Sequence, residues 1–257
     1  MPVNLEIVDD VAIVTLDDPE SLNALDDRMT ADTVMALEKV AADESVRALV
    51  LTGTGRAFSV GGKLPMLAEM TEEATGTDGR AVLEARMRSN ARLVEILRSM
   101  PQMSIAAING ACVGAAIGWI SACDLRVATS NAKFNTAFLS LGLSSDFGTT
   151  KLLADAVGQS TAADWLLRPR PVSAQEAFAS GLVNEVVDTG ILLQTALDWA
   201  RIAVNFPTGV AALKSNLQDA SKLPLGECLE RETERFAHSL TAPETTAQIR
   251  NLSLRRE

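Results

Sequence analysis

The chain has 257 residues, of which 47% are hydrophobic and 22% charged, as in globular proteins with a buried core. Its net charge of −10 argues against nucleic-acid binding, which needs a basic face. No apolar run reaches the roughly 18 residues of a membrane span, and the acidic start MPVNLEIVDD is unlike a signal peptide. We therefore expect a cytoplasmic protein with no nucleic-acid or membrane partner.

The chain has three cysteines, one histidine and no tyrosine. Cys112, Cys123 and Cys228 form no C-x-x-C pair, which favours reduced, buried thiols. Because His238 stands alone, a histidine-rich metal site is excluded, and Ser-His-Asp catalysis would depend on this one position. The GTGRAF segment lacks the third glycine of a dinucleotide-binding loop. We expect no metal, nucleotide or flavin.

The first hundred residues predict alternating strands and helices. Residues 3–8 and 11–16 alternate around two aspartates and predict a hairpin, and the apolar spacing in 27–42 predicts a helix. The other expected elements here are a buried strand at 48–53, a loop at 56–64, a mobile segment at 65–79, and a helix at 80–100 that ends before Pro101.

The rest of the chain continues this alternation and then becomes helical. The expected elements are a strand at 104–108, a helix of small residues, a strand at 124–128, a strand, loop and helix within 134–158, a helix at 174–180 capped by Ser173, and a strand at 182–187. Everything from about residue 190 predicts helix. We expect an α/β core over residues 1–195 and a helical C-terminal region over 196–257.

Two loops rich in small residues follow apolar strands. One carries Gly61 and Gly62, and the other, AINGACVGAAIG, carries Gly110, Gly114 and Gly118. Since glycine costs roughly 1 kcal/mol against alanine inside a helix, the backbone itself must be needed there. Close packing of a helix on a strand would explain it. Alternatively, two exposed main-chain N–H groups could converge on a carbonyl oxygen and form an oxyanion hole.

Five segments resemble the crotonase superfamily, the enoyl-CoA hydratase/isomerase family. They are PESLNAL (19–25), ALVLTGTGRAFSVGGKL (48–64), IAAINGACVGAAIGWISACDLRVAT (105–129), GLSSDFGTT (142–150) and SAQEAFASGLVNEVV (173–187). The resemblance implies a spiral of ββα turns followed by a helical trimerisation region, assembled as a homotrimer or homohexamer. It also implies an acyl-CoA thioester substrate, so that coenzyme A is part of the substrate and no separate cofactor is expected.

The resemblance assigns ligand contacts residue by residue. Gly62 and Ala115 match the two backbone N–H groups that hold the thioester oxygen, with Ala115 replacing the usual glycine. Lys63 replaces the usual aspartate and could meet a phosphate or be a solvated loop lysine. Lys214 resembles a lysine that approaches the coenzyme phosphates, with a surface helical lysine as the alternative. The implied substrate and coenzyme contacts are Ser21, Leu22, Ala24, Val60, Gly61, Lys63, Leu64, Phe138 and Lys214.

Hydratases of this family use two glutamates to position and split water, and both are missing here. Their positions match Gly118, on the helix of small residues, and Phe138, further along the chain. Neither glycine nor phenylalanine can transfer a proton. The resemblance therefore implies a family member that lacks the usual general acid and base of hydration.

Asp146 of GLSSDFGTT is the acid that remains in a suitable motif. Δ3,Δ2-enoyl-CoA isomerases carry a catalytic Glu or Asp at the matching position, so the resemblance implies that Asp146 moves a proton from C2 to C4 of a 3-enoyl thioester. Phe138 and Phe147 could desolvate this carboxylate and raise its pKa. The alternative is that Asp146 caps the helix that begins near Gly148.

Three other functions stay open. A hydratase or another crotonase-type lyase would need relocated acids, for which the candidates are Glu69, Glu72, Glu73 and Glu84. A non-catalytic acyl-CoA-binding homologue would need none. An aryl-CoA hydrolytic dehalogenase would use Asp146 as a nucleophile but also a histidine base early in the chain, whereas His238 lies in the helical tail. The acyl chain length, the pathway and the choice between trimer and hexamer are not predicted.

Overall fold

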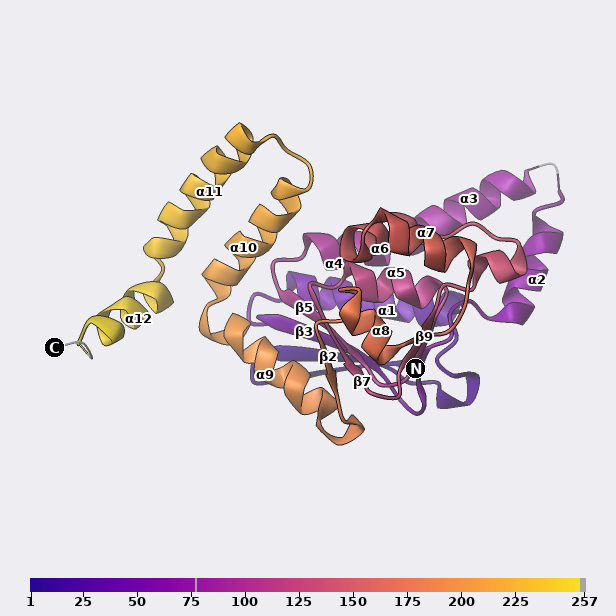
Figure 1. Ribbon diagram of the computed structural model, residues 1–257, viewed down its shortest axis with the longest axis horizontal. Helices are drawn as coiled ribbons and strands as arrows, with labels where there is room; N and C mark the ends of the chain where they lie inside the picture. Colours follow the sequence, from indigo (N-terminus) through magenta and orange to yellow (C-terminus); the bar gives the residue numbers. More distant parts are fainter. Residues whose placement is uncertain (77, 255–257) are drawn as a thin grey trace.

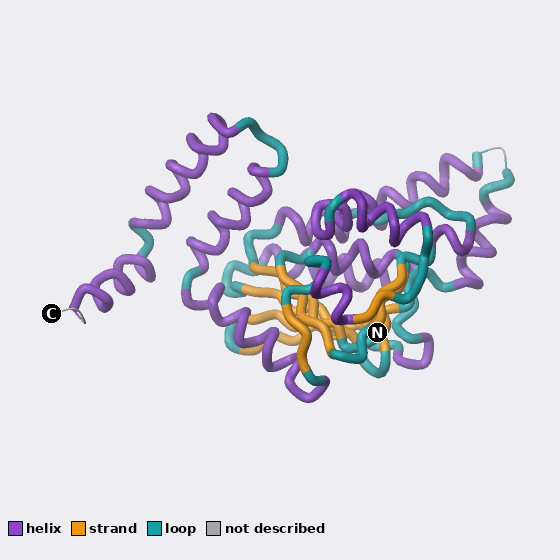
Figure 2. Tube along the Cα trace, viewed as in Figure 1, coloured by secondary structure: helices purple, strands orange, loops and turns teal. Residues whose placement is uncertain are grey.

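The structure is a computed structural model that describes residues 1–76 and 78–254, with two sheets and surrounding helices (Figures 1 and 2). The larger sheet has the order β1 (Val3–Val8), β2 (Val11–Leu16), β3 (Ala48–Gly53), β5 (Met103–Ile108), β7 (Leu125–Thr129), β10 (Glu185–Val187). The smaller sheet has the order β4 (Ala57–Ser59), β6 (Ala111–Val113), β8 (Lys133–Asn135), β9 (Val172–Ser173).

Successive turns of the chain each add one strand to each sheet. Strands β3, β5 and β7 pair in parallel in the larger sheet, and β4, β6 and β8 pair in parallel in the smaller one. Helix α5 (Ala115–Ala122) follows β6, and helix α6 (Thr149–Val157) follows β8 after a loop. This arrangement confirms the expected α/β fold and its spiral of ββα turns.

Local sequence signals explain several of these elements. Asp9 and Asp10 adopt left-handed φ angles of 49° and 63° between β1 and β2, as a tight hairpin turn requires. Helix α1 (Asp27–Ala42) begins where the Asp26 side chain accepts a hydrogen bond from the Met29 N–H. Ser173 likewise caps helix α8 (Ala174–Ala179), as expected.

The segment between β3 and β5 differs from expectation. The expected loop at 56–64 contains β4, whose residues are buried. The expected mobile segment contains most of helix α2 (Leu64–Glu73), and Pro65 stands in its first turn, where proline is tolerated. The expected helix at 80–100 is divided into α3 (Gly79–Asn90) and α4 (Arg92–Ser99). Residue 77 of the expected mobile segment lies outside the described residues.

The C-terminal part is helical, as expected up to residue 254, while residues 255–257 of that expectation lie outside the described part. Helix α9 (Leu192–Asn205) buries Ala196, Ala200 and Ala203 against the larger sheet. The expected boundary after residue 195 therefore falls inside a helix of the core. Beyond α9, an arm extends away from the sheets (Figure 1). The arm consists of α10 (Pro207–Ala220), α11 (Leu225–Leu240) and α12 (Pro243–Leu254).

The remaining elements are α7 (Gln159–Leu167) and the short 3-10 helices η1 (Pro19–Ser21), η2 (Phe138–Leu141) and η3 (Thr189–Ile191). The three cysteines are buried and free, as expected. None of the helices in the described ranges has the length and apolar character that a membrane crossing requires.

Candidate functional site

A cavity of about 1220 Å³ opens between α2, α3, the start of α5 and the loop that precedes α6. Most of the expected site residues line this cavity. They are Ser21, Ala24, Val60, Gly62, Lys63, Leu64, Ala115, Phe138 and Asp146. Leu22, Gly61, Gly118 and Lys214 are not among the residues that line it.

The loop that carries Ser21 and Ala24 is fixed by a buried asparagine. Asn23 has a left-handed φ of 55° and donates from Nδ2 to the carbonyl oxygens of Thr54 (3.0 Å) and Ala57 (2.9 Å). Its Oδ1 accepts from a backbone N–H of the same loop. Leu22 contributes through its carbonyl, which accepts from the Val60 N–H. We did not single out Asn23, although asparagine within an apolar segment is a signal for left-handed backbone.

Gly61 allows the two glycine-bearing loops to meet. Its φ is +78°, and a Cβ atom there would lie 2.6 Å from the Val113 carbonyl oxygen and 3.4 Å from the Ala115 nitrogen. Within the described part of the chain, neither the Gly62 nor the Ala115 N–H donates to a backbone acceptor. Ala115 is the first residue of α5, where an N–H has no helical partner. Both residues line the same cavity, and neither N–H is used in the backbone hydrogen bonds of the described residues.

The three glycines around α5 have different roles. Gly114 lines the cavity with a φ of +58°. A Cβ atom at Gly110 would lie 2.1 Å from the Arg56 carbonyl oxygen, so this glycine is required by backbone packing. A Cβ atom at Gly118 would lie 2.6 Å from Thr149 Oγ1. Close packing therefore explains Gly110 and Gly118, whereas Gly114 faces the space expected for a ligand.

Asp146 lines the cavity just before α6. Its Oδ1 is buried and has no hydrogen-bond partner among the described residues. Burial raises the pKa of Asp146 to about 6, partly offset by a hydrogen bond from its own backbone N–H. The N-cap of α6 is Gly148, and no side chain caps this helix. The capping alternative for Asp146 is therefore wrong, and the pKa shift has the expected direction.

Apolar side chains form much of the cavity wall. Phe138 and Phe147 line it, and the Phe147 ring packs edge-on against Trp119 with centroids 5.8 Å apart. Two helices add apolar residues that we did not predict as site residues: Leu67, Met70, Leu83 and Met87. Their spacings of three and four residues were the available signal, because such residues share a helix face.

Charged side chains stand at the cavity rim. Lys63 Nζ lies 3.3 Å from Asp26 Oδ2, with 41% of the lysine side chain exposed. Glu84 lines the cavity and pairs with Arg80 and Arg88, all three being more than half exposed. The other acids considered as relocated catalytic groups, Glu69, Glu72 and Glu73, do not line the cavity.

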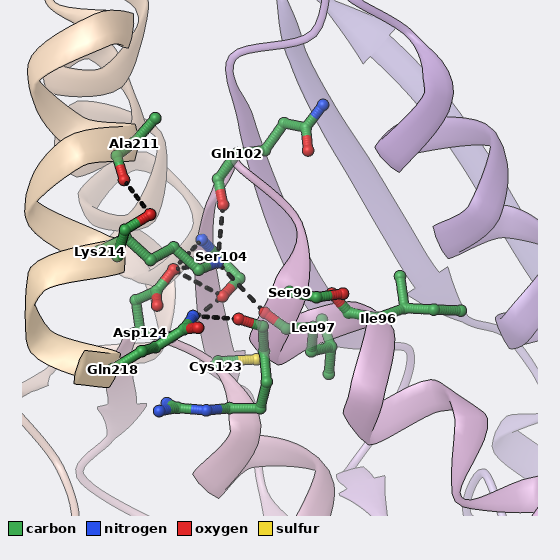
Figure 3. A network of polar contacts seen from close by, with 12 residues as sticks. Ile96, Leu97, Ser99, Gln102, Ser104, Cys123, Asp124, Ala211, Lys214 and Gln218 are labelled. Carbon is green, nitrogen blue, oxygen red and sulfur yellow. Dashed lines mark hydrogen bonds and ion pairs between the residues drawn. The ribbon is translucent and has the colours of Figure 1, made fainter. Parts of the chain in front are cut away.

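Lys214 does not reach the cavity. It is 7% exposed and points from α10 into the core, where Nζ lies 2.8 Å from Asp124 Oδ2 (Figure 3). The same ammonium donates to the carbonyl oxygens of Leu97 (3.1 Å) and Gln102 (2.9 Å). Its three donors are thus occupied. Both the expected coenzyme contact and the surface alternative are wrong, because this lysine joins α10 to the core.

The single histidine of the chain does not line the cavity that contains Asp146. His238 is exposed on α11 and lines a separate cavity of about 670 Å³ between the arm and the core. A histidine base is therefore not among the residues around Asp146.

Comparison with known proteins agrees with the fold and the cavity. The family described as enoyl-CoA hydratase/isomerase matches residues 6–249. The chain is 31% identical over 259 residues to 4-chlorobenzoyl coenzyme A dehalogenase-1 from Arthrobacter sp, covering 98% of this chain and 92% of that protein. It is 34% identical over 230 residues to 1,2-epoxyphenylacetyl-CoA isomerase from Escherichia coli, covering 88% and 86%.

A solved structure of an enoyl-CoA hydratase has the same fold. The crystal structure of an enoyl-CoA hydratase from Polaromonas sp. JS666 matches with a TM-score of 0.84 and 31% identity, covering 93% of this chain and 91% of that one. The named relatives thus include a dehalogenase, an isomerase and a hydratase. The chain belongs to the enoyl-CoA hydratase/isomerase family of the crotonase superfamily.

Proposed function

We propose that this protein is an enoyl-CoA isomerase that moves the double bond of a 3-enoyl-CoA thioester into conjugation with the thioester carbonyl. One observation carries the proposal. Gly62 and Ala115, whose N–H groups make no backbone hydrogen bond in the described structure, line the same cavity as Asp146. The Asp146 carboxylate has one buried oxygen, Oδ1, without a partner among the described residues.

The two N–H groups would hold the thioester oxygen. Because Ala115 begins α5, the positive end of the helix dipole adds to their attraction for developing negative charge. A backbone donor of this kind is worth about 3 kcal/mol in a transition state. The coenzyme would extend past Ser21, Ala24 and Lys63, and the acyl chain would lie among the apolar residues of α2 and α3.

The reaction needs one group that first acts as a base and then returns the proton as an acid. Asp146 takes a proton from C2, and the electron pair moves through the C3–C4 double bond and the carbonyl to give a dienolate. The proton then returns from Asp146 to C4, leaving a double bond between C2 and C3. With a pKa of about 6, Asp146 is mostly ionised at pH 7 and more basic than an ordinary aspartate.

The test is an assay of 3-enoyl-CoA isomerisation, in which the absorbance of the conjugated product measures the rate. We expect Asp146→Asn to lower kcat by at least about 100-fold, because a positioned acid–base group contributes this much. Glu84→Gln is the matched control, since Glu84 is the other carboxylate on the cavity wall. An Asp146→Asn enzyme as active as the wild type would refute the proposal.

The same panel separates the alternatives. Hydration of a 2-enoyl-CoA that depends on Glu84 would identify a hydratase with a relocated acid. Halide release from a 4-halobenzoyl-CoA would identify the activity named for the Arthrobacter relative, although the cavity offers no histidine base. Binding of acyl-CoA without turnover of any of these substrates would identify a non-catalytic homologue.

A further inference from the structure

The turn that carries Asp146 rests directly on helix α5. A Cβ atom at Gly118 would lie 2.6 Å from Thr149 Oγ1 and 3.0 Å from the Phe147 carbonyl oxygen. Real Cβ atoms do not approach other atoms so closely without displacing them. The space above Gly118, where a hydratase would direct a glutamate, is therefore filled by the turn that holds Asp146.

Thr149 fastens this turn. Its N–H and its hydroxyl both donate to the carbonyl oxygen of Asp146, at 2.9 and 2.7 Å, and the residue is fully buried. Between Asp146 and Thr149, the residues Phe147 and Gly148 adopt left-handed φ angles of 48° and 68°. A phenylalanine keeps such a conformation only where its surroundings hold it. The two bonds from Thr149 are part of that restraint.

The turn and the backbone donors share one rigid support. Ala115 begins α5, and Gly118 lies three residues later on the same helix face. Docking the turn on Gly118 therefore sets the position of Asp146 relative to the Ala115 N–H.

We propose that Thr149, seated against Gly118, is a positioning residue that aims the Asp146 carboxylate at the substrate carbons. This inference rests on the proposed isomerase function. Thr149 acts through Asp146 and does not line the cavity itself. Its loss should therefore change the chemical step far more than substrate binding.

The test compares Thr149→Val with Thr149→Ser and with Thr150→Val. Valine keeps the shape of threonine but cannot donate, whereas serine restores the hydroxyl. The hydroxyl of Thr150 pairs with Ser145 and not with Asp146, so Thr150→Val is the matched control. We expect Thr149→Val to lower kcat by about 10- to 100-fold with KM little changed, as a small misplacement of a catalytic group does. Thr149→Ser should recover most of the rate.

Gly118→Ala provides a second route, because its methyl group pushes on the Thr149 hydroxyl. It should give the same selective loss of kcat. Equal rates for Thr149→Val and Thr150→Val, or no recovery with serine, would overturn the positioning role.

An NMR titration of the aspartate carboxyls gives a readout that does not depend on turnover. The raised pKa of Asp146 should move toward the ordinary aspartate value in Thr149→Val and stay in place in Thr150→Val. An unmoved value would count against the inference. Full activity of Asp146→Asn would instead defeat the proposed function, whatever the behaviour of Thr149.

Discussion

The half-buried carboxylate of Asp146 lowers the stability of the folded protein when it is ionised. An aspartate is stabilised by water and by donors, and Asp146 Oδ1 has no donor among the described residues. Its pKa is raised to about 6 from 3.8, so the folded state binds a proton that the unfolded state has released between these pH values. Folding stability therefore falls as pH rises through this window.

This linkage predicts that Asp146→Asn stabilises the protein at neutral pH. The variant cannot ionise, so its advantage over the wild type should grow by up to about 3 kcal/mol between pH 4 and pH 7. Urea unfolding of both proteins across this range measures the difference. A difference that does not change with pH would contradict the burial of Asp146.

At the residue scale, the sequence and the family resemblance predicted residues that the fold brings to one cavity. Asp146, Gly62 and Ala115 were named because short motifs carry them, and the structure places all three on one cavity. Asn23 and Thr149 were missed because their roles depend on backbone groups that the fold brings to them. Lys214 was misassigned because a lysine in a helix gives no local sign that a carboxylate will meet it inside the core.

The ion pair between Lys214 and Asp124 is a buried polar link between the α10 helix and the core (Figure 3). Asp124 also accepts from the N–H and hydroxyl of Ser104, both at 2.8 Å. Burial lowers the pKa of Lys214, and the charge of Asp124 opposes that effect. The ammonium of Lys214 thus joins helix α10 to strand β5 through Asp124 and Ser104.

We predict that Lys214→Met destabilises the protein by about 3 kcal/mol, because it leaves Asp124 without its counter-ion. Lys222→Met, at an exposed lysine just beyond α10, is the control and should cost little. Hydrogen exchange should show faster exchange in α10 alone, and adding Asp124→Asn should recover part of the loss in urea unfolding. Equal stability of the two lysine variants would refute this role.

At the element scale, periodicity predicted most strands and helices, including the hairpin, α1 and the capped α8. The failures lie in the segment between β3 and β5. Threonine and glycine there suggested a mobile chain, yet Leu67 and Met70 turn one face of α2 toward the cavity. Tertiary contact outweighed local propensity, as it often does in short helices. The pairing that makes β4 a strand is likewise non-local.

The whole molecule has an uneven shape because α10 lies beside the core while α11 and α12 extend away from the sheets (Figure 2). Helix α11 exposes a row of large apolar side chains at helical spacing, namely Leu225, Leu229, Phe236 and Leu240. A row of this kind on a helix normally packs against a partner. This row predicts that α11 packs against another chain, and the trimer or hexamer that the family resemblance implies would supply that chain.

We predict that light scattering after size-exclusion chromatography will give three or six times the chain mass of 27.3 kDa. Phe236→Glu should shift the protein toward the monomer, because a charge would replace an apolar contact. Met35→Glu, at an exposed apolar residue of α1, is the control and should leave the assembly intact. A wild-type mass equal to one chain would contradict the prediction.

The fit of the Asp146 turn over Gly118 also has an evolutionary consequence. A glutamate at position 118 would collide with Thr149 and with the Phe147 backbone, so it could not simply be added to the present enzyme. Conversion of this scaffold to water addition would require the turn to be rebuilt in the same step. This contact predicts strong epistasis between position 118 and residues 146–149, because neither side of the contact can change alone.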